Sequence, residues 1–68
     1  MNTLGEELPK EMARVRDVMM PMYRGIGPAG GFALAMMKAA LDRATTALVE
    51  GDVVEMMRSY EALKGFKE

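Results

Sequence analysis

Residues 29–52 read AGGFALAMMKAALDRATTALVEGD, and this stretch sets the fold class expected for the chain. It is rich in alanine and leucine, which have high helix propensity, and Lys38 and Asp42 have the spacing of an ion pair on a helix surface. Gly51 follows at a position where a left-handed residue commonly ends a helix. The sequence therefore predicts a long helix over about residues 29–50.

A second helix is predicted directly after this one, over about residues 53–64. Asp52 and Glu55 have the spacing of a capping box, and apolar residues then recur at helical intervals until Gly65 ends the pattern. That apolar face consists of Val53, Met56, Met57, Tyr60 and Leu63. Because the turn between the two helices is short, they should form an antiparallel hairpin.

The N-terminal part of the chain predicts one further helix, over about residues 5–24. Its apolar residues are spaced alternately by four and three positions, which is the repeat of a helix seam. The seam consists of Leu8, Met12, Val15, Met19, Met22 and Ile26. Two starts are open: a capping box from Thr3 to Glu6, or a first turn at Pro9.

Pro21 interrupts the backbone hydrogen bonding of this first helix. The helix should kink between Asp17 and Pro21 or stop at Met20, and we favour a kink with Gly25 as the terminator. A Gly-rich connector at residues 25–28 then leads to the second helix. No strand pattern is present, so we expect an all-α protein, a single domain of three helices.

The composition excludes most catalytic chemistry. The 68 residues carry a formal charge of −1 and contain no cysteine, histidine or tryptophan. The chain therefore lacks a disulfide framework, a thiolate nucleophile, an imidazole base and the ordinary zinc ligands. The hydroxyls of Ser59, Thr45 and Thr46 have no visible base to activate them. We expect no enzyme activity, no catalytic residue, no metal and no cofactor.

The glycines of the connector have the spacing of a dinucleotide-binding turn. Gly25, Gly27 and Gly30 fit G-x-G-x-x-G, but a helix rather than a strand precedes them, and no Lys-Ser or Lys-Thr follows as in a P-loop. A flexible connector is the preferred interpretation. An alternative function stays open, because free N–H groups at the start of the next helix could hold an anion or small ligand at Gly27 to Gly31.

The basic residues of the first helix do not predict a nucleic-acid interface. Lys10, Arg14, Arg16 and Arg24 are interleaved with Glu6, Glu7, Glu11 and Asp17. Proteins that bind nucleic acids usually show a clustered basic footprint, so a solvated charged face is the preferred interpretation. No nucleic-acid partner is expected, and an accessory role near nucleic acid is kept only as an alternative function.

A run of apolar residues carries the main functional hypothesis. Residues 32–37 are all apolar and cover the whole circumference of a helix, more than two short partner helices can hide. The start of this helix and the residues before the connector should therefore pack, through deformable methionines, against another subunit. The predicted interface residues are Met19, Met20, Met22, Tyr23, Phe32, Ala33, Leu34, Met36 and Met37.

These observations predict a non-catalytic interaction or assembly module that associates with itself. A C₂ homodimer is the default, and an unidentified protein partner is the alternative. The N-terminal residues 1–11 carry three glutamates and one lysine, unlike a secretory signal, and the longest uncharged run, residues 25–37, has thirteen residues. A membrane-spanning helix needs about 20 apolar residues, so we expect a cytoplasmic protein with no membrane partner.

Two resemblances accompany this prediction. Residues 51–63, from Gly51-Asp52 to Tyr60-Glu61-Ala62-Leu63, resemble the second half of a tetratricopeptide repeat, which implies a helical hairpin. The Ala-Leu pair comes one residue early, and the tryptophan, leucine-glycine and tyrosine signals of the first repeat helix are missing. Through its Gly-Pro-Ala-Gly-Gly break and Glu-Gly-Asp-Val-Val turn, the chain also resembles small uncharacterised helical proteins of prophages and bacterial genomes.

Overall fold

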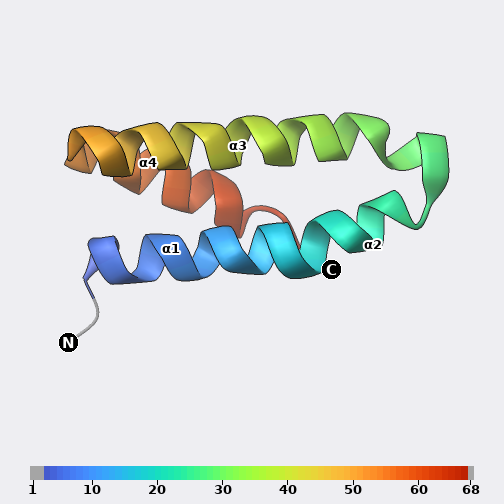
Figure 1. Ribbon diagram of the computed structural model, residues 1–68, viewed down its shortest axis with the longest axis horizontal. Helices are drawn as coiled ribbons and strands as arrows, with labels where there is room; N and C mark the ends of the chain where they lie inside the picture. The colour runs from blue at the N-terminus through green and yellow to red at the C-terminus, as the bar shows by residue number, and fades with distance from the viewer. Residues whose placement is uncertain (1–2, 68) are drawn as a thin grey trace.

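The computed structural model describes residues 3–67, and this part of the chain is helical almost throughout (Figure 1). In chain order the elements are α1 (Leu4–Arg14), a π-helical turn (Val15–Met19), α2 (Met20–Arg24), a 3₁₀ turn (Gly27–Gly30), α3 (Gly31–Glu50) and α4 (Val53–Lys64). No strand occurs within residues 3–67. The predicted all-α class is confirmed.

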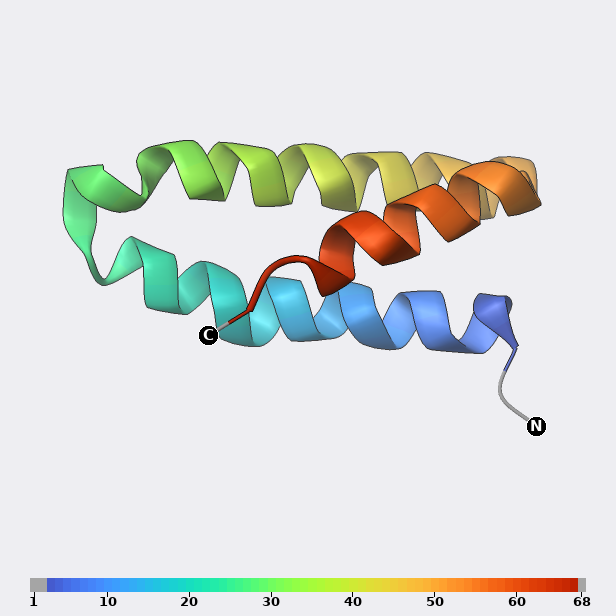
Figure 2. The same ribbon diagram turned by 180° about the vertical axis from the view of Figure 1, so that it is seen from behind.

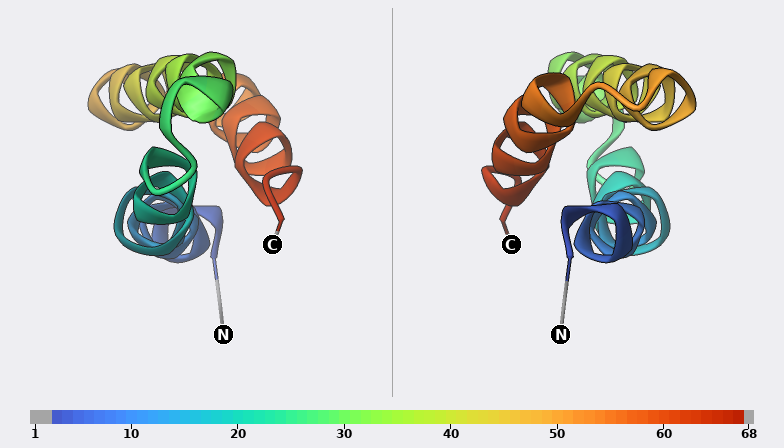
Figure 3. Two further views of the ribbon diagram at one scale, coloured as in Figure 1. Left: turned by 90° about the vertical axis from the view of Figure 1, so that its right-hand side faces the viewer. Right: turned by 90° about the vertical axis from the view of Figure 1, so that its left-hand side faces the viewer.

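The helices form three rods. The first consists of α1, the π-helical turn and α2, and α3 runs back along it in the opposite direction (Figure 1). After a short turn α4 reverses again and packs against both α3 and α1, as the views from behind and along the long axis show (Figures 2 and 3). Because α4 has 12 residues and α3 has 20, α4 covers only part of the length of α3.

Pro21 lies within the first rod, which continues to Arg24 rather than ending at Met20. The residues before Pro21 form the π-helical turn, in which the Met20 N–H donates to the carbonyl oxygen of Val15, five residues earlier. A π turn holds one residue more than an α turn, so it rotates every later side chain by about 100° relative to an uninterrupted helix.

This rotation changes which residues face the core. The seam prediction holds for the buried residues Leu8, Val15 and Met19. It is wrong beyond the π-helical turn, because Met22 and Ile26 are exposed while Met20 and Tyr23 pack against the core in their place. The inward positions after the turn are thus shifted by one residue.

The core is small and lies where the three rods meet. Its buried apolar residues are Leu8, Val15, Met19, Met37, Ala40, Ala44, Ala47, Met56 and Leu63. Alanine supplies three of the four buried side chains of α3, which allows the other two rods to approach its backbone closely. The larger residues Leu41 and Leu48 lie half-buried at the border of this alanine face.

The ends of α3 and α4 at their shared turn agree with the predicted boundaries. Gly51 is left-handed (φ +67°), its N–H donates to the Leu48 carbonyl oxygen, and the Asp52 N–H donates to the Ala47 carbonyl oxygen, which together form a Schellman motif. The Asp52 carboxylate accepts from the Glu55 N–H at 3.2 Å and caps α4. The reciprocal half of the predicted box is absent, because the Asp52 N–H is already bonded to Ala47.

At the N-terminal end, α1 begins at Leu4 with Thr3 as the preceding residue, and Pro9 lies inside the helix. The helix therefore does not start at Pro9. The expected capping box from Thr3 to Glu6 is not formed by side chain to backbone bonds, because the Thr3 hydroxyl donates to the Glu6 carboxylate instead, at 3.3 Å.

The connector is longer than predicted, and α3 begins at Gly31 rather than near residue 29. Gly27 is left-handed (φ +70°), a conformation that favours glycine, and a 3₁₀ turn follows it. Gly30 is buried, and a Cβ atom at this position would clash with the backbone carbonyl oxygen of Tyr23. These glycines allow the first rod and α3 to approach each other across a short link.

Candidate interaction surface

The nine predicted interface residues fall into three groups. Two of them, Met19 and Met37, are fully buried by the chain itself, so their side chains belong to the core and not to a surface for another subunit. Four are half-buried: Met20, Tyr23 and Ala33, which pack against that core, and Leu34. Three are exposed: Met22, Phe32 and Met36.

The exposed members lie on either side of the α2–α3 connector, with Met22 in α2 and Phe32 and Met36 in α3. We define the connector patch as Met22, Ile26, Phe32 and Met36, whose exposed fractions are 46%, 57%, 79% and 48%. The rotation at the π-helical turn exposes Met22, and Ile26 lies beyond the end of α2 in the connector. The other two residues lie in the first two turns of α3, which extend past the C-terminal end of α4 (Figure 2).

Two hollows adjoin the connector patch. Met36 lines a hollow of about 460 Å³ between α3 and the C-terminal end of α4. Its other lining residues are Ala39, Ala40, Arg43, Ala62, Gly65 and Phe66. Met22 and Ile26 line a smaller hollow of about 210 Å³ with Tyr23 and Lys67. The small alanine and glycine side chains leave room beside Met36 for a side chain of a partner.

A second exposed apolar surface flanks the α3–α4 turn. We define the turn patch as Val49, Val53, Val54 and Met57, which are exposed by 82%, 65%, 60% and 48%. Val53 and Met57 were predicted to lie on the apolar face of α4, but the buried face of this helix consists of Met56, Ser59 and Leu63. Sequence reasoning missed this patch because Ser59 occupies a core position that periodicity assigns to an apolar residue.

Arg14 links the first rod to the C-terminal residues of the described chain. Nη2 of Arg14 donates to the carbonyl oxygens of Leu63 and Phe66 at 3.0 and 2.8 Å, and its Nε donates to the Glu11 carboxylate. The prediction of a solvated basic side chain is therefore wrong for Arg14. No local sequence signal indicates this contact, since its partners follow about fifty residues later along the chain.

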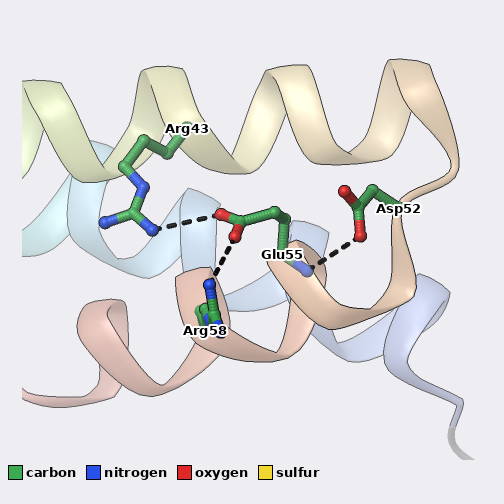
Figure 4. Close-up of polar contacts among 4 residues, drawn as sticks. All are labelled: Arg43, Asp52, Glu55 and Arg58. Atoms are coloured by element: carbon green, nitrogen blue, oxygen red, sulfur yellow. Dashed lines mark hydrogen bonds and ion pairs between the residues drawn. The ribbon is translucent and has the colours of Figure 1, made fainter.

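Other charged residues form exposed pairs. Glu55 accepts from Arg43 on α3 at 3.1 Å and from Arg58 at 2.9 Å, as the close-up shows (Figure 4). Arg16 donates to Asp17 at 2.9 Å, and this hydrogen bond lowers the pKa of the Asp17 carboxyl from its ordinary value. Within residues 3–67 no three residues of the types histidine, cysteine, aspartate and glutamate are grouped to hold a metal ion.

Comparison with known proteins assigns no function to this chain, so a functional proposal has to rest on the surface features. No protein-family model, curated protein or solved structure matches the chain. Within the part that the structure describes, no helix combines the length and apolar character needed to span a membrane. The features that require a functional explanation are the connector patch, its hollows and the turn patch.

Proposed function

We propose that this protein is a non-catalytic helical interaction module that associates with further copies of itself through the connector patch. The exposure of Phe32 carries the proposal, since 79% of this aromatic residue is accessible in the single chain. Met36, one helical turn later on α3, is also exposed and borders the larger hollow. A large exposed aromatic residue with a second exposed apolar residue one turn away on the same helix is typical of a protein interface.

The stability of so small a domain also favours association. A chain of this size buries only about 60% of the surface that its unfolded form exposes, so its own core supplies little stability. Fully covering a side chain such as Phe32 contributes about 1.5–3 kcal/mol, and a partner that binds only the folded chain stabilises it. Self-association would thus bury apolar surface that α4 is too short to cover.

The alternative functions have less support. Gly27 and Gly30 have structural explanations in the backbone of the connector, so their spacing no longer suggests an anion or ligand site. The basic side chains of Arg16 and Lys38 are paired with neighbouring carboxylates, and Arg14 is bonded to backbone carbonyls. Such engaged side chains do not form the continuous basic footprint that nucleic-acid binding requires.

Sedimentation analysis over a range of protein concentrations tests the proposal. The wild-type chain should sediment as an oligomer at micromolar concentration, and Phe32→Glu should shift it to the monomer. Because Phe32 is exposed, this change should leave the helical circular dichroism intact. Thr45→Glu is the matched control, since it adds the same charge at an exposed site on α3 outside both patches. A monomeric wild-type chain at high micromolar concentration would contradict the proposal.

A further inference from the structure

We infer that copies of this chain associate head to tail, with the connector patch of one copy packed against the turn patch of the next. This inference rests on the proposed self-association and specifies the surface that each patch contacts. It replaces the expected C₂ dimer, in which one patch would face its own copy.

The first observation is the placement of the two patches. The α2–α3 connector lies at one end of the long axis and the α3–α4 turn lies at the other (Figure 1). The molecule extends 36 Å along this axis and 15 Å along its shortest one. A single chain therefore cannot cover one patch with the other, whereas two copies placed end to end bring them together.

The second observation is the distribution of charge along the same axis. The half of the molecule toward the turn, residues 3–14 and 38–60, keeps the Arg14–Glu11 and Lys38–Asp42 ion pairs together and has seven carboxylate and five basic side chains, a net charge of −2. The half toward the connector, residues 15–37 and 61–67, has four basic and two carboxylate side chains, a net charge of +2. The described chain is thus a charge dipole with an apolar patch at each end.

The charged residues next to each patch carry the same sign as the net charge of the half of the molecule in which that patch lies. Glu50 and Asp52 lie between the valines of the turn patch in the sequence, and both are exposed. Arg24 lies between Met22 and Ile26, and Lys67 lines the hollow that these two apolar residues share. Oppositely charged rims around two apolar surfaces favour contact between unlike ends.

The charges also disfavour the symmetric alternative. An isologous C₂ contact through the connector patch would bring two positive ends together, and one through the turn patch would bring two negative ends together. A contact between unlike ends avoids both repulsions. A pair of copies joined in this way still has a free turn patch at one end and a free connector patch at the other. Further copies can therefore add to form an open chain, or the chain can close into a ring.

Two variants that each block one end distinguish these arrangements. Phe32→Glu places a charge in the connector patch and leaves the turn patch intact. Val53→Glu does the reverse, and glutamate is compatible with the first turn of α4 because it interacts favourably with the N-terminal end of a helix. Circular dichroism of each variant establishes that the helices are retained, and Thr45→Glu serves as the folded control with both patches intact.

Each blocked variant alone should be a monomer, while an equimolar mixture should form a 1:1 complex. In the mixture, the intact connector patch of Val53→Glu meets the intact turn patch of Phe32→Glu, so the mass measured by light scattering should rise about twofold and no further. Raising the salt concentration should weaken the complex by screening its charges.

A mixture that stays monomeric, or a Val53→Glu variant that dimerises alone, overturns the head-to-tail arrangement. In the second case the proposed self-association stands, whereas a monomeric wild-type chain overturns both proposals.

Discussion

Arg14 of α1 donates from Nη2 to the carbonyl oxygen of Phe66, two residues beyond the end of α4, at 2.8 Å. The same nitrogen donates to the carbonyl oxygen of Leu63, at 3.0 Å. Leu63 lies in the last turn of α4 and its carbonyl oxygen also accepts from the Phe66 N–H, so the cation from the first rod adds a second bond there and complements the helix dipole. This contact holds the C-terminal residues against the first rod, where Phe66 lines one of the two hollows and Lys67 lines the other.

Replacing Arg14 by methionine should therefore destabilise the fold. Methionine retains an unbranched side chain but removes the donors, and hydrogen bonds from charged groups contribute about 1.5–3 kcal/mol each, less where the donor is partly exposed. We expect the free energy of unfolding, measured with urea, to fall by about 1–3 kcal/mol. Arg16→Met is the matched control, since Arg16 pairs with Asp17 at the surface and its loss should leave stability nearly unchanged. Equal effects of the two substitutions would contradict a role of Arg14 between the rods.

Two adjacent glycines should respond oppositely to alanine. A Cβ at Gly30 would clash with the backbone carbonyl oxygen of Tyr23, so Gly30→Ala should force the connector apart and destabilise the fold by more than about 1 kcal/mol. At Gly31 a Cβ meets no atom within 4 Å, and the residue is already helical. Gly31→Ala should stabilise the chain by about 0.4–1 kcal/mol because it restricts the unfolded state. Thermal unfolding of both variants tests this prediction, and a stable Gly30→Ala variant would show that the rods do not approach as closely as described.

The cap of α4 provides a third prediction. Asp52→Ala removes the acceptor for the Glu55 N–H, which should reduce the free energy of unfolding by about 1 kcal/mol. Asp52→Asn retains a side-chain oxygen at the same position and should lose little. Urea unfolding of the two variants separates the stability contributed by the capping hydrogen bond from that contributed by the negative charge. If asparagine is as destabilising as alanine, the negative charge rather than the hydrogen bond is what stabilises the turn.

Local signals predicted the helix ends at the α3–α4 turn and failed where a contact depends on distant residues. Gly51 and Asp52 act through bonds to residues within five positions, so their spacing was sufficient to place the boundaries. The partners of Arg14 lie about fifty residues away, and no periodicity indicates them. The change of register at the π-helical turn could be predicted only in part. Pro21 indicates that the helix is irregular, but it does not specify which side chains face the core after it.

The same limit explains which parts of the candidate surface could be predicted. The excess of apolar residues in 32–37 predicted correctly that Phe32 and Met36 would be uncovered, but not that Met37 would be buried. Ile26 was assigned to the seam, but α2 ends at Arg24 and Ile26 is exposed in the connector. Val53 was assigned to the buried face of α4, since hydrophobic periodicity does not show that a serine occupies the core instead.

That serine provides the last prediction. Ser59 is 1% exposed, and its Oγ atom has no hydrogen-bond partner among the described residues. A buried hydroxyl without a partner loses its hydration and gains nothing in return, which disfavours folding by about 1–3 kcal/mol. Ser59→Ala removes the hydroxyl and introduces a residue of higher helix propensity, so it should raise the free energy of unfolding by about 1 kcal/mol or more. Ser59→Thr is the comparison variant, because it keeps the hydroxyl and adds a methyl group to a closely packed site, and it should destabilise the chain. A loss of stability in Ser59→Ala would mean that the hydroxyl is bonded in solution, to water or to a neighbouring copy.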